Sequence, residues 1–495
     1  MRILTAAEMR AADRRTIEAG IPGIVLMENA ACRVVEFLAG HFAPLEDQRI
    51  TVLCGKGNNG GDGMAIARQI HVRFPGAALR VELFCDPAEL AGDAAANFNM
   101  LEAAQVMRAD GGARCPTLVI DALLGTGVTG PATGRALEGI RKINALAADG
   151  GAKIVAVDIP SGLPSDSGEP GGEFAHADYT VTFTAAKPCH VFPPNCDHVG
   201  ALTVTPIGTP ASFYDNAQLE LVEPAMFREL LAPRPPDGHK GTFGHALIVA
   251  GSIGKTGAAA MCGIAALRAG AGLVTVASDP AVLGQISSHA PELMTESIAN
   301  LRQAGKGKTV IAMGPGLGRT PETEATVQQA LKEFAQPMVI DADALTGEIR
   351  GEGRVRVLTP HPGEMARISG KSAAEIAKDR VGVARAFACE HGVTLVLKGH
   401  RTAIAFPDGR VWINPTGSPA MGTGGTGDVL TGMIAGFLAQ FAAKPDLAVA
   451  AAVYLHGLAG QIGARALGEK CLIATDLFDY LPDAMEECAQ IPHGV

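Results

Sequence analysis

Short apolar runs alternate with stretches of helical spacing along the first half of the chain. Thr5 and Glu8 have the spacing of a capping box at the start of the first such stretch, and Gly20 and Pro22 mark its end. The runs that predict strands are rich in β-branched residues. They are ITVLCG (50–55), RVELFC (80–85), TLVIDALLGTG (117–127), KIVAVDIPSG (153–162) and YTVTFTA (179–185).

The second half repeats this alternation with different motifs. Its predicted strands are ALIVAGS (246–252), LVTVAS (273–278), KTVIAMGPG (308–316), PMVIDADAL (337–345), RVLTPHPGE (356–364) and VTLVLKG (393–399). The segment RTAIAFPDGRVWINP (401–415) predicts a hairpin that turns at Asp408-Gly409. Alternating strands and helices predict mainly parallel, doubly wound α/β sheets in both halves.

The clearest break between the halves is APRPPDG (232–238), because its three prolines oppose both helices and interior strands. We therefore expect two domains, covering residues 1–230 and 231–495. The chain has 495 residues, more than one ordinary hydrophobic core accommodates.

Composition and charge narrow the class of protein. Hydrophobic residues make up 47% of the chain and charged residues 19%, which predicts a globular protein. The formal net charge of −10 argues against nucleic acid as a partner. The ten cysteines include no C-x-x-C pair, and the charged N-terminus does not resemble a signal peptide. No uncharged apolar run reaches about 18 residues. We expect a cytoplasmic protein with no membrane partner.

A glycine loop, Gly424 to Gly427, precedes Asp428 and an apolar helical stretch. Its backbone N–H groups and the helix N-terminus favour a phosphate or a developing oxyanion. The aspartate has two readings at this stage: an N-cap, where Asp is common, or a general base beside an anion hole.

Other polar or glycine-rich segments end strands of the second half, at 314–318, 359–364 and 398–402. Ligands of open α/β sheets bind at the carboxyl ends of strands, so we expect these segments to converge on one face. GSIGKTG (251–257) resembles a P-loop, but that motif needs glycine where the chain has Val249. Lys255 is therefore expected at the surface or beside a phosphate.

Together with GTGD, the motifs AGSIGKTGAA, MGPGLG, TPHPGEM and LKG resemble the ADP-dependent NAD(P)H-hydrate dehydratases, over about residues 239–460. The resemblance implies a ribokinase-like α/β domain and contacts with a hydrated nicotinamide at Ala258, Gly318, His361 and Asp428. It implies nucleotide contacts at Lys398, Gly399, His400, Arg401, Thr402 and Gly427.

The family's reaction explains those residue types. Transfer of a phosphoryl group from ADP turns the C6 hydroxyl of hydrated NAD(P)H into a good leaving group, which releases AMP and phosphate. Asp428 would deprotonate the hydroxyl, the loop amides would stabilise charge, and Mg²⁺ is expected on the diphosphate. The choice of ADP over ATP rests on the resemblance alone. A kinase for a vitamin precursor or sugar is the alternative, because GTGD fits it equally well.

In the first half, GKGNNGGDG (55–63) separates a strand from a helix and holds more glycines than a tight turn requires. Asp121 and Asp158 end apolar strands, where an unpartnered carboxylate would be costly. They are either satisfied structural residues or parts of a site. Asn59, Asp121 and Ser161 offer oxygen ligands only, which suits a hard cation.

With LTAAEMRAADRRTIEAGIPGIVLMENAA, DALLGTGVTGP and DIPSGL, this segment resembles the NAD(P)H-hydrate epimerases, over about residues 3–164. The resemblance implies a Rossmann-like doubly wound domain and a K⁺ site at Asn59, Asp121 and Ser161. It implies substrate contacts at Asn58, Asn59, Gly60, Gly61, Asp62, Gly125, Thr126, Gly127, Val128, Thr129, Gly130, Pro131 and Asp158.

Epimerisation at C6 requires the hydroxyl to leave, or the ring to open, and the oxygen to return on the other face. Asp158 is the candidate acid/base. We expect both halves to act on hydrated NADH or NADPH, with the epimerase supplying the S form that the dehydratase consumes, and we expect a homo-oligomer. A regulatory or scaffold role for the first half is the alternative.

Overall fold

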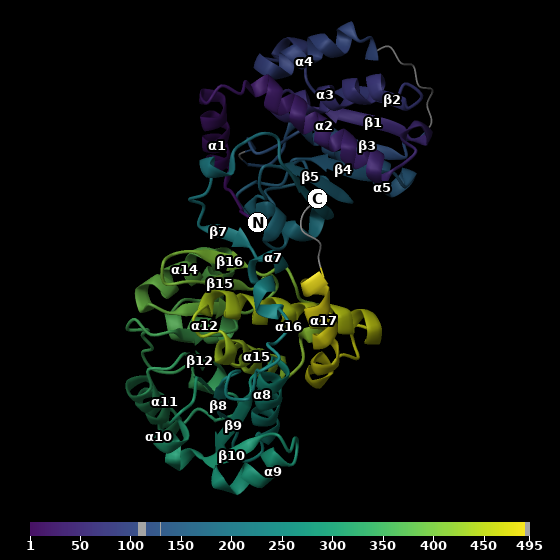
Figure 1. Cartoon of the computed structure of the whole chain (residues 1–495). Coiled ribbons are helices and arrows are strands. Elements are labelled where there is room, and N and C mark those ends of the chain that lie inside the picture. The colour runs from purple at the N-terminus through teal and green to yellow at the C-terminus, as the bar shows by residue number, and fades with distance from the viewer. Residues whose placement is uncertain (107–114, 129, 491–495) are drawn as a thin grey trace. The chain divides into compact units, whose positions relative to one another are not determined.

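The computed structural model describes residues 1–106, 115–128 and 130–490, and the chain divides into two compact units, Met1–Ala217 and Gln218–Val495 (Figure 1). The boundary expected after residue 230 lies farther along the chain than this division. The difference has a structural reason: strand β7 (Leu219–Leu221) pairs with β16 (Val411–Ile413) and so extends the sheet of the second unit.

The first unit contains a six-stranded parallel sheet in the order β2-β1-β3-β4-β5-β6. Its strands are β1 (Arg49–Cys54), β2 (Ala78–Leu83), β3 (Leu118–Ala122), β4 (Lys153–Val157), β5 (Tyr179–Phe183) and β6 (Ala201–Thr205). The chain reverses its direction of travel across the sheet between β2 and β3. Ligands of doubly wound sheets bind at such a switch point, beyond the carboxyl ends of the strands.

Helices cover both faces of this sheet, as Figure 1 shows. On one face, α2 (Gly23–His41), α3 (Asn58–Arg73) and α4 (Gly92–Ala103) share a core with the strands, and α5 (Gly134–Gly150) packs on the other. The capping box of α1 (Ala6–Glu18) is confirmed, because the Thr5 hydroxyl accepts from Glu8 N and the Glu8 carboxylate accepts from Thr5 N.

The second unit has a ten-stranded sheet in the order β10-β9-β8-β11-β12-β13-β14-β15-β16-β7. The other bounds are β8 (His245–Val249), β9 (Leu273–Ser278), β10 (Met294–Ser297), β11 (Val310–Met313), β12 (Met338–Ile340), β13 (Arg356–Leu358), β14 (Thr394–Leu397) and β15 (Ala403–Ala405). Neighbouring strands are parallel except β14 with β15 and β15 with β16. The predicted hairpin is thus confirmed as β15 and β16.

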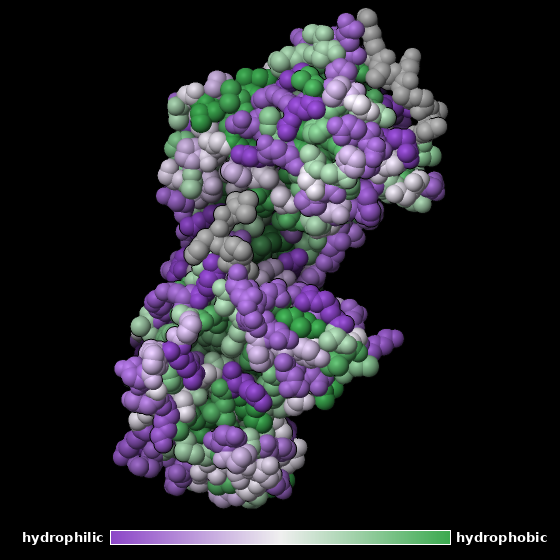
Figure 2. Space-filling model, turned by 45° about the vertical axis from the view of Figure 1, so that its right-hand side comes forward, coloured by the Kyte–Doolittle hydropathy of each residue, from purple (hydrophilic) through white to green (hydrophobic). Residues whose placement is uncertain are grey.

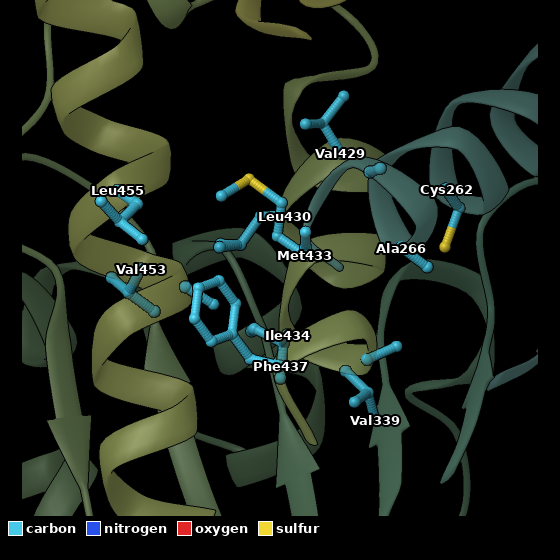
Figure 3. Packing of buried hydrophobic residues seen from close by; sticks show 14 of the residues in the cluster. Cys262, Ala266, Val339, Val429, Leu430, Met433, Ile434, Phe437, Val453 and Leu455 are labelled. Carbon is cyan, nitrogen blue, oxygen red and sulfur yellow. The ribbon is translucent and has the colours of Figure 1, made fainter. Parts of the chain in front are cut away.

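Helices α8 (Thr256–Arg268), α15 (Thr426–Gln440) and α16 (Pro445–Leu467) pack together against the sheet of this unit, as Figure 3 shows. Small residues let α15 approach α8 closely. A Cβ atom at Gly432 would lie 2.1 Å from Cys262 O, and one at Gly436 would lie 2.5 Å from Ala266 O. This close packing fixes the N-terminus of α15 relative to the strand ends. The remaining longer helices are α11 (Pro321–Glu333), α12 (Pro362–Ser369), α14 (Arg380–His391) and α17 (Leu477–Gln490).

Within the described part of the chain, α16 is the one helix long and apolar enough to cross a bilayer by length and composition. About two thirds of its apolar window, 67%, is buried in the unit, where it packs on α15 and α17. The visible surface interleaves hydrophilic and hydrophobic residues in both units (Figure 2), as folded proteins commonly do.

Candidate functional sites

A cleft of about 900 Å³ lies at the carboxyl ends of the strands in the first unit. This volume is within the usual range for small-molecule sites, roughly 300–1,000 Å³. Four cationic residues, Arg10, Lys56, Arg135 and Lys187, lie among its walls, and their positive charge suits a ligand that carries phosphates. The predicted residues that line it are Asn58, Asn59, Asp62, Gly125, Thr126, Gly127, Val128, Gly130, Pro131 and Asp158.

Among the described residues, two of the predicted substrate contacts do not line this cleft. Gly60 and Gly61 lie in the first turn of α3, which begins at Asn58, so the predicted glycine loop is shorter than expected. A Cβ atom at Gly60 would lie 1.8 Å from Gly55 O, and one at Gly61 would lie 2.8 Å from Met27 Cε. Both glycines therefore allow close packing beneath the site. Thr129 lies outside the described residues.

Asp158 follows β4 at the floor of the cleft, with a left-handed backbone (φ 66°). Its Oδ1 accepts hydrogen bonds from Lys187 Nζ (2.6 Å) and Thr182 Oγ1 (2.9 Å). Burial acts to raise the pKa of Asp158, but Lys187 and these hydrogen bonds outweigh it and hold the pKa below its usual value. Asp158 is therefore a carboxylate at neutral pH.

Two further carboxyl groups, Asp62 and Asp13, line the same cleft, and the pKa of each is raised. Burial raises the pKa of Asp62 well above its usual value, and the charges of Asp158 and Asp13 raise it further against the effect of Lys187. Burial also raises the pKa of Asp13. The cleft thus combines one carboxylate of lowered pKa with two carboxyl groups of raised pKa, and environments that push such pKa values apart suit acid/base chemistry.

Asn59, Asp121 and Ser161 meet beside the cleft and are all buried. Asp121 accepts from Ser161 N (2.8 Å) and Ser161 Oγ (2.5 Å), while Asn59 Nδ2 donates to Leu124 O (2.9 Å). Burial raises the pKa of Asp121 to about 6, despite the hydrogen bonds from Ser161. The buried Asn59 Oδ1 has no hydrogen-bond partner among the described residues. This set of oxygen atoms fits a hard cation.

In the second unit, Asp428 lies in the first turn of α15 but does not cap it. The N-cap is Gly425, whose φ of 98° is left-handed. The N-cap reading of Asp428 is therefore wrong, because the tight glycine turn starts the helix three residues earlier than an Asp428 N-cap requires. Its carboxyl group is instead free to act at the helix N-terminus.

Lys398 follows β14 and points toward the start of α15. Its Nζ donates to Asp341 Oδ1 (2.8 Å), and a Cβ atom at Gly427 would lie 3.4 Å from Nζ. Thr431 Oγ1 donates to Asp341 Oδ2 (2.7 Å). Burial acts to lower the pKa of Lys398, but Asp341 and Glu364 raise it on balance, so the ammonium stays charged beside the helix N-terminus. Lys398 and the N-terminus of α15 together place positive charge where an anion can bind.

The other predicted residues join this site through two further carboxylates. Gly318 N donates to Asp343 Oδ2 (2.8 Å), and His361 N donates to Glu364 Oε2 (2.8 Å). Glu364 Oε2 lies 3.8 Å from Lys398 Nζ. The loop that carries Gly318 packs on α8, because a Cβ atom at Gly316 would lie 3.1 Å from Ala258 Cβ.

Lys398 to Thr402 form a tight turn between β14 and β15. Gly399 and Arg401 have positive φ angles of 143° and 59°, and Thr402 Oγ1 donates to Gly399 O (3.0 Å). Arg380 Nη1 donates to His400 O (2.6 Å), which fixes the turn. The whole segment therefore lies at the same edge of the sheet as Asp341.

The electrostatics of Asp428 follow from this setting. Burial and the charges of three carboxylates raise its pKa to about 7, against the opposing charge of Lys398. The three carboxylates are Asp341, Asp343 and Glu364. A carboxyl group with this pKa exchanges a proton near neutral pH, which suits a general base.

The sequence interpretation missed several of these residues. Asp341 and Asp343 directly follow β12 in DADAL, and Glu364 belongs to the TPHPGE segment. A carboxylate at a strand end was the available signal for the first two. Lys187 and Asp13 in the first unit gave no such signal, because neither lies in a glycine-rich or strand-end motif.

Two family profiles match the chain. The profile described as NAD(P)H-hydrate dehydratase matches residues 246–483, and the profile described as YjeF-related protein N-terminus matches residues 23–189. Each match falls within one of the two structural units.

Similar proteins cover nearly the whole chain. A bifunctional NAD(P)H-hydrate repair enzyme Nnr from Moorella thermoacetica is 42% identical, over 97% of this chain and 96% of the relative. The protein of the same name from Escherichia coli is 36% identical, over 87% and 84%. An ADP/ATP-dependent NAD(P)H-hydrate dehydratase from Bacillus subtilis, co-crystallised with ATP and Mg²⁺, has a TM-score of 0.50 and 36% identity, over 54% of this chain and 98% of that structure.

Proposed function

The chain belongs to the family of bifunctional NAD(P)H-hydrate repair enzymes, and from that premise we propose which residues carry each activity. The second unit is the dehydratase, with Asp428 as its base, and the first is the epimerase, with Asp158 in its acid/base step. The observation that carries the dehydratase assignment is Asp428, with its pKa near 7, next to the Lys398 ammonium and the start of α15.

In the proposed dehydration, Asp428 takes the proton of the C6 hydroxyl group. The hydroxyl oxygen attacks the terminal phosphoryl group of ADP at the same time, and AMP leaves. Lys398 and the α15 N-terminus stabilise the transferring phosphoryl group. The nitrogen lone pair then expels phosphate, and loss of a proton from C5 restores the dihydropyridine. Ala258, Gly318 and His361 would contact the hydrated nicotinamide.

We propose that residues 398–402 and Gly427 hold the nucleotide. Asp343 and Glu364 offer carboxylate oxygens at the same edge, and such ligands suit Mg²⁺ on a diphosphate. Bound Mg²⁺ would neutralise phosphate charge. The Bacillus subtilis relative is an ADP/ATP-dependent enzyme, so the choice of ADP over ATP in this chain stays a prediction.

A product assay separates repair from a kinase activity. Purified protein with ADP and hydrated NADH is expected to yield NADH, AMP and free phosphate, followed by the absorbance of the reduced nicotinamide and by phosphate release. Accumulation of a phosphorylated substrate without NADH would support a kinase instead and would contradict the proposal.

The pH dependence of dehydration follows from Asp428. Only the ionised carboxylate acts as a base, so kcat/KM should rise as pH increases through about 7 and should fall about tenfold per pH unit below it. A pH profile measured with the S epimer and saturating ADP tests this. A profile that is flat from pH 5 to 8 would remove Asp428 from the base role.

In the first unit we propose that Asn59, Asp121 and Ser161 bind K⁺, because Asn59 Oδ1 is buried without a partner among the described residues. Asn59 Nδ2 shares the acceptor Leu124 O with Ser161 Oγ, which also donates to Asp121. A tenfold excess of K⁺ over its Kd should then raise the Tm of this unit by about 3–5 °C. Thermal unfolding is compared in potassium and tetramethylammonium chloride at equal ionic strength. Asp121→Asn should abolish the difference, and an equal K⁺ effect in this variant would count against the site.

Location and assembly stay predictions. All ten cysteines are free, which fits the reducing cytoplasm that we propose. The expected homo-oligomer is open to a direct measurement of mass in solution.

A further inference from the structure

Lys187 is a buried cation at the floor of the first cleft, between β5 and the short helix α6 (Pro188–Val191). Its side chain is only 1% exposed. Burial of an ammonium group is costly unless it is paired and hydrogen-bonded. A lysine held in this position beside a ligand cleft therefore calls for a functional explanation.

All three N–H donors of the Lys187 ammonium have acceptors. Nζ lies 2.6 Å from Asp158 Oδ1, 2.7 Å from Thr182 Oγ1 and 3.1 Å from Phe183 O. Since an ammonium group has three donors, this set is complete. Because Nζ makes all three of these contacts, Lys187 is not placed as a nucleophile toward a ring-opened aldehyde.

Only one of the two carboxylate oxygens of Asp158 takes part in this pairing. Its Oδ1 accepts from both Lys187 and Thr182, whereas among the described residues no donor contacts Oδ2. A Cβ atom at Gly125 would lie 3.7 Å from Oδ2, so this oxygen faces the predicted substrate loop. One oxygen is anchored and the other is presented to the cleft.

We propose that Lys187 is a positioning residue for epimerisation: together with Thr182 it fixes the Asp158 carboxylate so that Oδ2 faces the C6 hydroxyl. This inference rests on the proposed role of Asp158. The other ionisable groups near the pair are Asp62 from α3, Asp13 from α1, and Cys189 and His190 from α6. Burial, followed by the charge of Lys187, lowers the pKa of His190 to about 3, so it is neutral and does not replace Lys187.

Lys187→Met removes the charge and keeps much of the side-chain volume. Epimer interconversion is measured by separating the two epimers chromatographically. The kcat should fall by about 100-fold, which is the effect of a misplaced catalytic group, and KM should change less than threefold. Lys187→Met combined with Asp158→Asn should lose no more activity than Asp158→Asn alone, because both changes act through one carboxylate. Independent, multiplying losses would overturn the inference, as would a kcat within threefold of the wild type.

Thr182→Val keeps the test decisive if Lys187→Met does not fold, since it removes one donor to Oδ1 with little change in shape. Its kcat should fall roughly fivefold, the factor for one hydrogen bond. Thr180→Val is the matched control, because Thr180 lies two residues earlier in β5 and donates to Val199 O instead. Equal effects of the two threonine variants would overturn the inference.

The Asp158→Asn variant separates the two levels of the proposal. Normal epimerisation by this variant would refute the role of Asp158, and with it the premise. Loss of epimerisation in Asp158→Asn together with normal turnover in Lys187→Met and Thr182→Val would refute the role of Lys187 alone. Dehydration of the S epimer by the same samples serves as a control, because it reports how much of the protein has a correctly folded dehydratase unit.

Discussion

Asp428→Asn is expected to lower the turnover of dehydration by about 10²–10⁴-fold, the usual contribution of a general base. The amide has nearly the shape of the carboxyl group but cannot accept the proton of the C6 hydroxyl. Lys398, Asp341 and the helix N-terminus remain in place, so nucleotide affinity should change little. Steady-state turnover with the S epimer and calorimetric titration of nucleotide measure the two quantities.

The matched control for this variant is Asp479→Asn. Asp479 also lies in the first turn of a helix, α17, but it is exposed and is not among the charged groups that shift Asp428. Its removal should leave turnover unchanged. Dehydration by Asp428→Asn within tenfold of the wild-type rate would show that another group accepts the proton.

Asp158→Asn is expected to lower epimerisation by a similar factor, about 10²–10⁴-fold, and to leave dehydration of the S epimer intact. The variant keeps a hydrogen-bonding side chain beside Lys187 but loses the ionised oxygen presented to the cleft. Epimer interconversion measured without nucleotide isolates this activity, because dehydration needs a phosphoryl donor.

Exposed Asp149, near the end of α5 in the same unit, provides the control Asp149→Asn, which should epimerise normally. If Asp158→Asn interconverts the epimers at the wild-type rate, the acid/base role passes to another group, and Asp62 and Asp13 are then the carboxyl groups to replace.

Each unit holds a carboxylate and a lysine ammonium together at the carboxyl ends of parallel strands. In the first unit Lys187 fixes Asp158, and in the second Asp341 fixes Lys398. The two pairs differ in which group faces the ligand. The first pair exposes a carboxylate oxygen to the ligand, which suits proton transfer, and the second exposes an ammonium group, which suits a phosphate.

Local patterns in the sequence predicted much of the fold. Most strands were visible as β-branched runs, and the hairpin followed from Asp408-Gly409. Two strands of the second sheet were not predicted. Residues 294–297 (β10) lack a clear apolar run. Strand β7 is only three residues long and lies at the edge of the sheet, so its pairing with β16, rather than its composition, determines that it forms a strand.

For the sites, the strand-end and glycine motifs predicted the two regions but not the full set of charges. Asp428 and Asp158 each stand at a recognisable turn. Lys187 could not be predicted, because it lies four residues beyond β5 and only the tertiary fold brings its ammonium group to Asp158, which follows the neighbouring strand β4. Gly60 and Gly61 resemble ligand contacts in sequence, and in the structure a Cβ atom at either position would meet Gly55 or Met27. Their contact with a ligand stays a prediction.

The central claim is that two sites on one chain repair both epimers of a hydrated nicotinamide nucleotide. It is tested most directly by incubating a mixture of R and S epimers with excess ADP and following NAD(P)H and the residual epimers over time. Wild-type protein should convert the whole mixture. Asp158→Asn should rapidly convert only the S fraction and then proceed at the uncatalysed rate of epimer exchange, whereas Asp428→Asn should exchange the epimers without forming NAD(P)H. Conversion of the whole mixture by Asp158→Asn at the wild-type rate, or a wild-type reaction that stops at the S fraction, would contradict the account.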